Sequence, residues 1–155
     1  MTRAYIGLGS NLGDRRTQLE GALRQLDEDP AISVVAVSSF RDTEPVGVVD
    51  QPRFLNAAAA LETSLEARGL LDRLLAVERA LGRDRSGERW GPRTVDLDLL
   101  LFGDVSCDEP GLTVPHPRLH ERRFVLEPLL ELDPALTLPD GLRLGDLLGS
   151  LEPGS

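Results

Sequence analysis

The order of apolar patterns along this sequence predicts a single α+β domain. Helical spacing of apolar residues marks two windows, 15–26 and 65–81, and the period-two or continuous apolar pattern of strands marks 4–8, 32–40, 54–63 and 94–102. In chain order these segments give β-α-β-β-α-β, the ferredoxin-like plan. It is an antiparallel sheet with both helices on one face, here followed by a C-terminal extension. We expect the other face to be open, with the first and third strands side by side, and likewise the second and fourth.

The N-terminal half alternates clear elements with glycine- or proline-rich breaks. The first strand is expected to break at the glycine-rich segment Gly7–Gly13, and Pro30 ends the connection that follows the first helix. The segment Arg41–Arg53 has three Pro or Gly residues and no periodicity, which favours a functional loop. Phe54–Thr63 is predicted as a strand although it contains four consecutive alanines.

Further elements follow in the second half. Ser64 is a candidate N-cap for the second helix, and Gly82 suits the position after its end. After a turn at Gly103 and Asp104, residues 105–114 suggest a small hairpin or peripheral strands. A helix over 118–132 is expected to break near Pro128, and a short helix covers 144–151. We assign residues 1–155 to one domain, with 141–155 peripheral.

Composition limits the classes of function. A net charge of −9 argues against a general nucleic-acid binder, which needs a basic face. All 17 basic residues are arginine, which excludes a mechanism that needs lysine. Seven of these arginines lie between residues 83 and 123, a local cationic region that suits a small anionic ligand. One cysteine, Cys107, and the lack of a signal-peptide core or membrane-length apolar run favour a cytoplasmic protein.

Two acidic residues occupy one face of the last predicted strand. Asp96 and Asp98 are two positions apart, so their side chains emerge on the same side. Adjacent anions repel in a sheet, and a divalent cation would offset that cost. Carboxylates roughly 7 Å apart along a strand can bind two cations at the spacing of about 3.5–4 Å of two-metal sites. A solvated strand face is the alternative, which the neighbouring arginines and Trp90 disfavour.

Four other features have both a structural and a functional interpretation. The glycines at Gly7–Gly13 fit a structural turn better than a dinucleotide fingerprint, because their spacing and the missing acidic residue do not match it. Glu78, on the apolar side of its helix, needs a partner, either an arginine or a ligand. His116 lies between two prolines, either on the surface or beside the arginines. Phe54 and Asn56 share a strand face, suited either to a planar heterocycle or to core packing.

Several motifs together resemble one enzyme family. They are Tyr5–Gly13, Gln51–Ala58, Val114–Pro117, Arg122–Leu129 and above all Arg89–Asp98, which reads Arg-Trp-Gly-Pro-Arg-Thr-Val-Asp-Leu-Asp. They closely resemble 6-hydroxymethyl-7,8-dihydropterin pyrophosphokinase of folate biosynthesis, over roughly residues 4 to 140. The resemblance implies a monomer that moves the β,γ-diphosphate of ATP to the hydroxymethyl oxygen of the pterin and releases AMP.

The resemblance also implies roles for individual residues. Asp96 and Asp98 would hold two Mg²⁺ ions and, with Arg83 and Arg93, form the catalytic set. ATP would be surrounded by Glu78, Arg85, Trp90, Arg93, Leu99, Thr113, His116 and Arg122. The pterin would contact Thr43, Pro45, Val46, Phe54, Asn56, Trp90, Asp96 and Phe124.

Two rival functions are open at the level of sequence. One is a nucleotide- or pterin-binding module without turnover on the same fold. The other is a single-stranded nucleic-acid binder, which the acidic balance and the lack of aromatic residues on the sheet disfavour.

Overall fold

The computed structural model describes residues 1–11, 14–43, 54–83 and 95–151. In chain order the elements are β1 (Thr2–Ser10), α1 (Arg15–Glu28), β2 (Ile32–Val37), β3 (Arg41–Thr43), β4 (Phe54–Thr63), α2 (Ala67–Arg83), β5 (Asp96–Phe102), β6 (Cys107–Glu109), β7 (Leu112–Val114), the 3-10 turn η1 (Leu119–Glu121), α3 (Arg123–Leu132) and α4 (Leu144–Ser150). The main sheet has the order β2-β4-β1-β5 with β3 paired to β4, and β6 and β7 form a hairpin. This arrangement confirms the predicted ferredoxin-like α+β fold and the hairpin.

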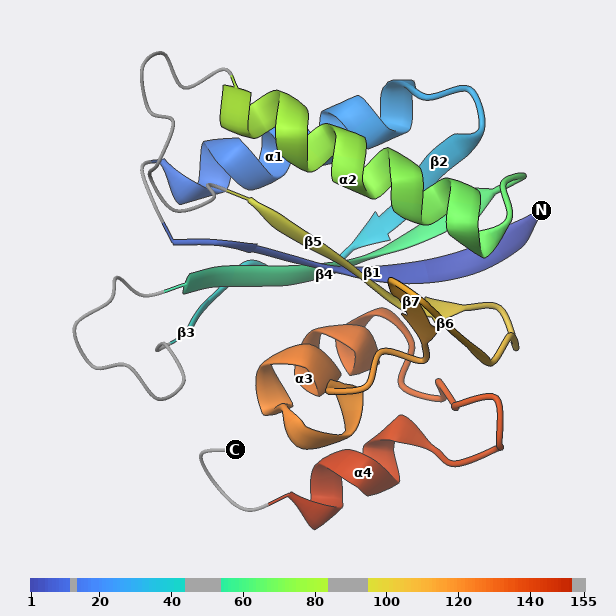
Figure 1. Cartoon of the computed structure of the whole chain (residues 1–155). Helices are drawn as coiled ribbons and strands as arrows, with labels where there is room; N and C mark the ends of the chain where they lie inside the picture. Colours follow the sequence, from blue (N-terminus) through green and yellow to red (C-terminus); the bar gives the residue numbers. More distant parts are fainter. Residues whose placement is uncertain (12–13, 44–53, 84–94, 152–155) are drawn as a thin grey trace.

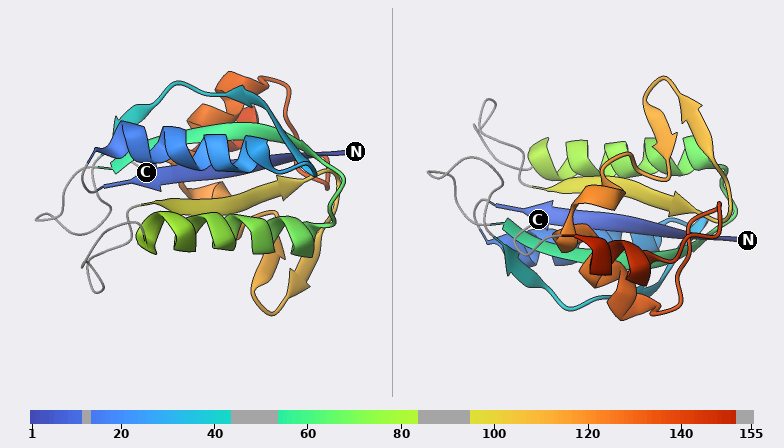
Figure 2. Two further views of the ribbon diagram at one scale, coloured as in Figure 1. Left: turned by 90° about the horizontal axis from the view of Figure 1, so that it is seen from above. Right: turned by 90° about the horizontal axis from the view of Figure 1, so that it is seen from below.

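The sheet lies between two helical layers. Helices α1 and α2 cover one face, and α3 and α4 lie on the other (Figures 1 and 2). The second face, predicted to be open, is therefore partly covered. Leu126, Leu129 and Leu144 are fully buried there, in a second apolar core that also contains Tyr5 and Leu100. Leu144 belongs to the last segment of the chain, which was expected to be peripheral.

Strand β1 continues through the glycines where the sequence predicted a break. It runs to Ser10 because it is paired along its length, with β4 on one side and β5 on the other. Among the described glycines, positive φ angles occur only at Gly103, Gly111 and Gly141, so Gly7 and Gly9 adopt ordinary backbone conformations. They therefore form no turn, and their lack of a side chain must matter for space.

The order of the strands corrects one predicted neighbourhood. The first and third strands of the plan, β1 and β4, are paired as expected. The second and fourth, β2 and β5, lie at opposite edges of the sheet. Each β-α-β crossover skips one strand, and the skipped strand fills the gap.

Helix α1 shows how local sequence sets an element. The carboxylate of Asp14 accepts a hydrogen bond from the backbone N–H of Thr17 at 3.1 Å, which caps the helix. Leu19, Ala22 and Leu26 recur at helical spacing and are buried against the sheet.

Four predicted boundaries are wrong. Gly82 does not follow the end of α2, because the helix runs to Arg83. Ser64 is not the N-cap of α2, because the Thr63 hydroxyl binds the N–H of Leu65 and the helix begins at Ala67. The second strand ends at Val37 rather than at Phe40. The predicted loop 41–53 opens with β3, because residues 41–43 pair with β4.

The C-terminal helical region breaks at Arg122 rather than near Pro128. Arg122 is extended, with φ −128° and ψ 114°, and separates η1 from α3. Helix α3 runs through Pro128, because Leu126 and Leu129 on either side are fixed in the second core. Within the described ranges, no helix combines the length and apolar character required to cross a membrane.

Candidate active site

The carboxylates of Asp96 and Asp98 lie on the same face of β5, as the period-two rule predicted. Leu97 and Leu99 between and beyond them point into the core under α1 and α2. Further along β5 the pairing with β1 shifts register, so that Tyr5 faces Leu101 and Ile6 faces Leu99. This bulge leaves the alternation intact around the two aspartates. Asp98 is exposed and Asp96 half-buried, so both side chains are at the surface of the second face.

Two glycines of β1, Gly7 and Gly9, lie beside the two carboxylates. Gly9 is paired with Asp96 on one side and with Asn56 on the other, and Gly7 is paired with Asp98 and Ala58. Neighbouring strands are about 4.8 Å apart, so Asn56 and Asp96 lie about 10 Å apart on either side of Gly9. We call the surface that Gly7 and Gly9 form between β4 and β5 the glycine floor. No β1 side chain divides this floor.

The side chain of Asn56 leans over Gly9. A Cβ atom added to Gly9 would stand 2.9 Å from Asn56 Oδ1 and 3.7 Å from Phe54 Cδ1. The glycine therefore leaves room for the amide and the ring on this face. Phe54 and Asn56 are both half-buried, and their joint position confirms the predicted shared face.

Strand β3 borders the same region, and the start of α3 carries two further predicted ligands. Thr43 is paired with Phe54, so the backbone of β3 runs beside the aromatic ring position. At the start of α3 the guanidinium of Arg122 lies 5.4 Å from the centroid of the Phe124 ring. This cation–π contact joins a predicted phosphate ligand to a predicted pterin ligand.

The carboxylate of Glu78 reaches from α2 to β5. Its Oε2 accepts a hydrogen bond from the backbone N–H of Leu97 at 2.6 Å. Leu97 lies between Asp96 and Asp98 on an edge strand, whose outer N–H groups need partners. One partner of this half-buried carboxylate is therefore a backbone amide, and Glu78 helps to fix the strand that carries both aspartates.

The backbone of His116 is hydrogen-bonded to β5. Its N–H donates to the carbonyl of Leu100 at 2.9 Å, after a cis peptide bond between Val114 and Pro115. Its Nδ1 accepts a hydrogen bond from the N–H of Arg118 at 3.2 Å. A neutral imidazole held in this way carries its proton on Nε2, which is then a donor for an anionic ligand.

The remaining predicted ligands differ in what the structure describes. The Leu99 side chain is in the core, so only its backbone is available on the site face. The hydroxyl of Thr113 donates to Asp108 at 3.2 Å within the hairpin. Arg83 is the last residue of α2. Pro45, Val46, Arg85, Trp90 and Arg93 lie outside the described residues.

The oxygen donors fit a hard divalent cation. Two carboxylates emerge side by side next to a strand without side chains, and Mg²⁺ commonly uses one or two carboxylates plus substrate phosphates. Among the described residues no group of three or more acidic, histidine or cysteine side chains could hold a metal ion.

Sequence reasoning missed the role of the glycines. Gly7 and Gly9 had been assigned to a turn, but they form the floor between Asn56 and Asp96. A glycine within a strand pattern can indicate close approach of another group, and that signal was present.

Comparisons with known proteins agree on one family. Residues 5–134 match the family model described as 7,8-dihydro-6-hydroxymethylpterin-pyrophosphokinase (HPPK). The chain is 49% identical over 148 residues to the 2-amino-4-hydroxy-6-hydroxymethyldihydropteridine pyrophosphokinase of Pseudomonas aeruginosa, covering 96% of this chain and 91% of that protein. It is 50% identical over 129 residues to the Bacillus subtilis protein of the same name, covering 83% and 77%.

Longer relatives contain the same region. The chain is 47% identical over 127 residues to a folate synthesis bifunctional protein of Arabidopsis thaliana, covering 82% of this chain and 26% of that protein. Among solved structures, the HPPK-DHPS triple mutant of Plasmodium falciparum superimposes with a TM-score of 0.75 at 13% identity. That match covers 96% of this chain and 43% of the other, and it supports the fold alone.

Proposed function

This chain belongs to the 7,8-dihydro-6-hydroxymethylpterin-pyrophosphokinase family, and we propose that it transfers the β,γ-diphosphate of ATP to the hydroxymethyl oxygen of 6-hydroxymethyl-7,8-dihydropterin. The products are AMP and the pterin diphosphate, and the reaction depends on Mg²⁺. The observation that carries this proposal is the paired row Asn56–Gly9–Asp96, in which an amide and a carboxylate share one face of the sheet on either side of a glycine. The enzyme is a pyrophosphokinase of folate biosynthesis; a cytoplasmic location and a monomeric state remain predictions.

The pterin occupies the Asn56 end of the floor. A pterin is flat and presents ring nitrogens and an amide edge, which match the donor and acceptor of an asparagine side chain. Phe54 and Phe124 offer aromatic faces for stacking. Thr43, Pro45, Val46 and Trp90 complete the pocket. This orientation directs the hydroxymethyl group across the glycines toward Asp96.

The phosphates occupy the Asp96 and Asp98 end. Two Mg²⁺ ions held by these carboxylates would neutralise phosphate charge and favour ionisation of the attacking hydroxyl. Arg83, Arg93 and Arg122 provide guanidinium donors for the migrating and leaving phosphates. His116 provides the Nε2–H donor, because its Nδ1 already accepts a backbone hydrogen bond.

The remaining ATP ligands are proposed from the family resemblance and are Glu78, Arg85, Trp90, Leu99 and Thr113. Leu99 would contribute through its backbone, because its side chain is in the core. The carboxylate of Glu78 already accepts a hydrogen bond from the N–H of Leu97. Glu78 would therefore fix β5 and contact ATP at the same time.

Transfer to an alcohol needs no covalent enzyme intermediate. The chain's residues bind both substrates, hold the hydroxymethyl oxygen in line with the β-phosphorus, and compensate the charge that develops. The Arg122–Phe124 contact supports this interpretation, since one helix start would contribute both a phosphate ligand and a pterin ligand.

The direct test identifies the nucleotide product. The protein is incubated with ATP, Mg²⁺ and 6-hydroxymethyl-7,8-dihydropterin, and nucleotides and pterins are separated by chromatography. We expect AMP to form in a one-to-one ratio with the pterin diphosphate. ADP formation would indicate transfer of a single phosphoryl group, and the absence of pterin-dependent turnover would refute the proposed reaction.

A further inference from the structure

Strand β3 is attached to the helical layers on both sides of the sheet. Within the part of the chain that the structure describes, it comprises residues 41–43 and is paired with β4. Arg41 and Asp42 are consecutive, so their side chains emerge on opposite faces. Arg41 reaches α3 on the second face, and Asp42 reaches the start of α1 on the first.

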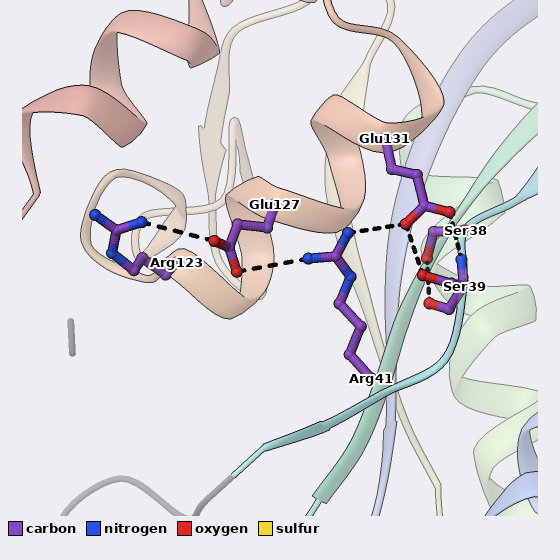
Figure 3. A network of polar contacts seen from close by, with 6 residues as sticks. All are labelled: Ser38, Ser39, Arg41, Arg123, Glu127 and Glu131. Carbon is purple, nitrogen blue, oxygen red and sulfur yellow. Dashed lines mark hydrogen bonds and ion pairs between the residues drawn. The ribbon is translucent and has the colours of Figure 1, made fainter. Parts of the chain in front are cut away.

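The attachment to α3 is a network of charged hydrogen bonds (Figure 3). The guanidinium of Arg41 lies 2.9 Å from Glu131 and 3.5 Å from Glu127, one helical turn apart on α3. Glu131 also accepts hydrogen bonds from the N–H and the hydroxyl of Ser39, both at 2.7 Å. Glu127 contacts Arg123 at 3.6 Å.

The chain just before β3 is fixed by the same network. The N–H of Ser38 donates to the carbonyl of Ala58 at 2.8 Å, and the Ser38 hydroxyl accepts the N–H of Ala58 at 2.9 Å. Ser38 is therefore bound to the central part of β4, and Ser39 is bound to α3. Helix α3 is itself a rigid support, since Leu126 and Leu129 are fully buried.

The attachment to α1 is a two-point ion pair. Arg15, the first residue of α1, donates to both carboxylate oxygens of Asp42, at 3.3 and 3.0 Å. Such paired contacts fix orientation as well as distance. Together with Arg41, this pair fixes β3, a strand of the sheet, to the helices on both faces.

We propose that Arg41 and Asp42 are positioning residues for the pterin pocket, which they keep in shape by clamping β3. The inference rests on the proposed function. Arg41 is paired with Asn56 and Thr43 with Phe54, so β3 is the immediate neighbour of the two residues at the pterin end of the floor. The clamp does not support β5, whose aspartates are fixed by β1 and Glu78.

The test separates the two substrates in steady-state kinetics. For Arg41→Ala and for Asp42→Asn we expect the KM for the pterin to rise about tenfold, as expected when one or two charge-assisted hydrogen bonds are lost. The KM for ATP should change less than about twofold, because β3 carries no proposed ATP ligand and α3, which begins after Arg122, is independently fixed by the buried Leu126 and Leu129. The charge-reversed pair Arg15→Asp with Asp42→Arg should recover most of the pterin KM. Arg3→Ala is the matched control, since it breaks a 2.8 Å ion pair with Glu62 at the far end of the sheet.

Hydrogen exchange provides a readout that does not need turnover. Backbone amides of residues 41–43 and 54–56 should exchange faster in Arg41→Ala and Asp42→Asn than in the wild type or in Arg3→Ala. The proposal would be overturned if amide exchange were unchanged in both variants, or if the KM values for the pterin and for ATP rose equally. If the wild type lacks pterin-dependent turnover, the proposed function fails, and the exchange rates alone decide whether β3 is clamped.

Discussion

Asn56 and Gly9 face each other on β4 and β1, and the amide oxygen of Asn56 stands 2.9 Å from where a Cβ of residue 9 would lie. A real side chain does not tolerate this distance. The amide of Asn56 therefore reaches over the sheet only because residue 9 is glycine. The relationship links the backbone of β1 to a proposed pterin-binding residue of β4.

Gly9→Ala should displace the Asn56 amide and weaken pterin binding. The added methyl group overlaps Asn56 Oδ1, so we expect the free energy of unfolding to fall by about 1–3 kcal/mol, the usual cost of overpacking. The pterin KM should rise more than the KM for ATP. Chemical denaturation and steady-state kinetics measure the two effects.

Gly7→Ala is the comparison within the same strand. A Cβ there would stand 3.4 Å from Cδ1 of the buried Leu100, which is an ordinary van der Waals distance. We expect a smaller loss of stability than in Gly9→Ala. Equal losses would show that glycine is needed by the β1 backbone rather than by Asn56.

Asp96→Asn and Asp98→Asn should each abolish turnover without unfolding the protein. Each variant replaces a carboxylate by a neutral amide of the same size at a surface position. We expect turnover to fall by at least about 100-fold, because Mg²⁺ binding and charge compensation are both weakened. Product formation and thermal unfolding are measured side by side.

The control for this pair is Asp104→Asn. Asp104 is exposed in the turn after β5 and remote from the proposed chemistry. It should keep wild-type turnover. Full activity in either Asp96→Asn or Asp98→Asn would remove the proposed metal role of that residue.

Glu78→Ala should loosen the start of β5. The variant leaves the N–H of Leu97 without its 2.6 Å acceptor, and we expect a loss of about 1–3 kcal/mol in the free energy of unfolding. Glu78→Gln keeps a carbonyl oxygen and should lose less. Hydrogen exchange at the Leu97 amide identifies the site, and protection there in Glu78→Ala would contradict the assigned role.

Local rules predicted the parts of the fold that depend on neighbouring residues. The shared face of Asp96 and Asp98 follows from the period of a strand, and the burial of Leu19 and Leu26 follows from the period of a helix. Contacts between distant segments decided the rest. The role of Gly9 depends on its pairing with Asn56, 47 positions later in the chain, which no local pattern encodes.

The second core shows the same limit. The apolar residues of α3 predicted a helix, but not that it would cover the second face of the sheet. That docking keeps α3 as one continuous helix through Pro128, and the break lies at Arg122. It also creates the contacts of Glu127 and Glu131 with Arg41, which the sequence did not reveal.

The carboxylate of Glu131 should make the stability of the protein depend on pH. The hydrogen bond from the Ser39 hydroxyl, followed by those from Arg41 and from the Ser39 N–H, lowers the pKa of this carboxyl group below its ordinary value. A carboxyl group with a lowered pKa in the folded state stabilises that state above its unfolded pKa, about 4.3 for glutamate, and loses this contribution as the pH falls through its folded pKa.

The comparison of the wild type with Glu131→Gln isolates this contribution. The difference in their free energies of unfolding should be largest above about pH 5 and should shrink as the pH falls below about 4. Denaturant unfolding at a series of pH values measures it, and Glu20→Gln, which affects only an exposed 3.3 Å pair with Arg16 on α1, is the control. In the Arg41→Ala background the dependence should be weaker, because one of the three donors is gone while both hydrogen bonds from Ser39 remain. A difference between wild type and Glu131→Gln that stays constant from pH 7 to pH 3 would mean that the ionised carboxylate does not support the β3 attachment.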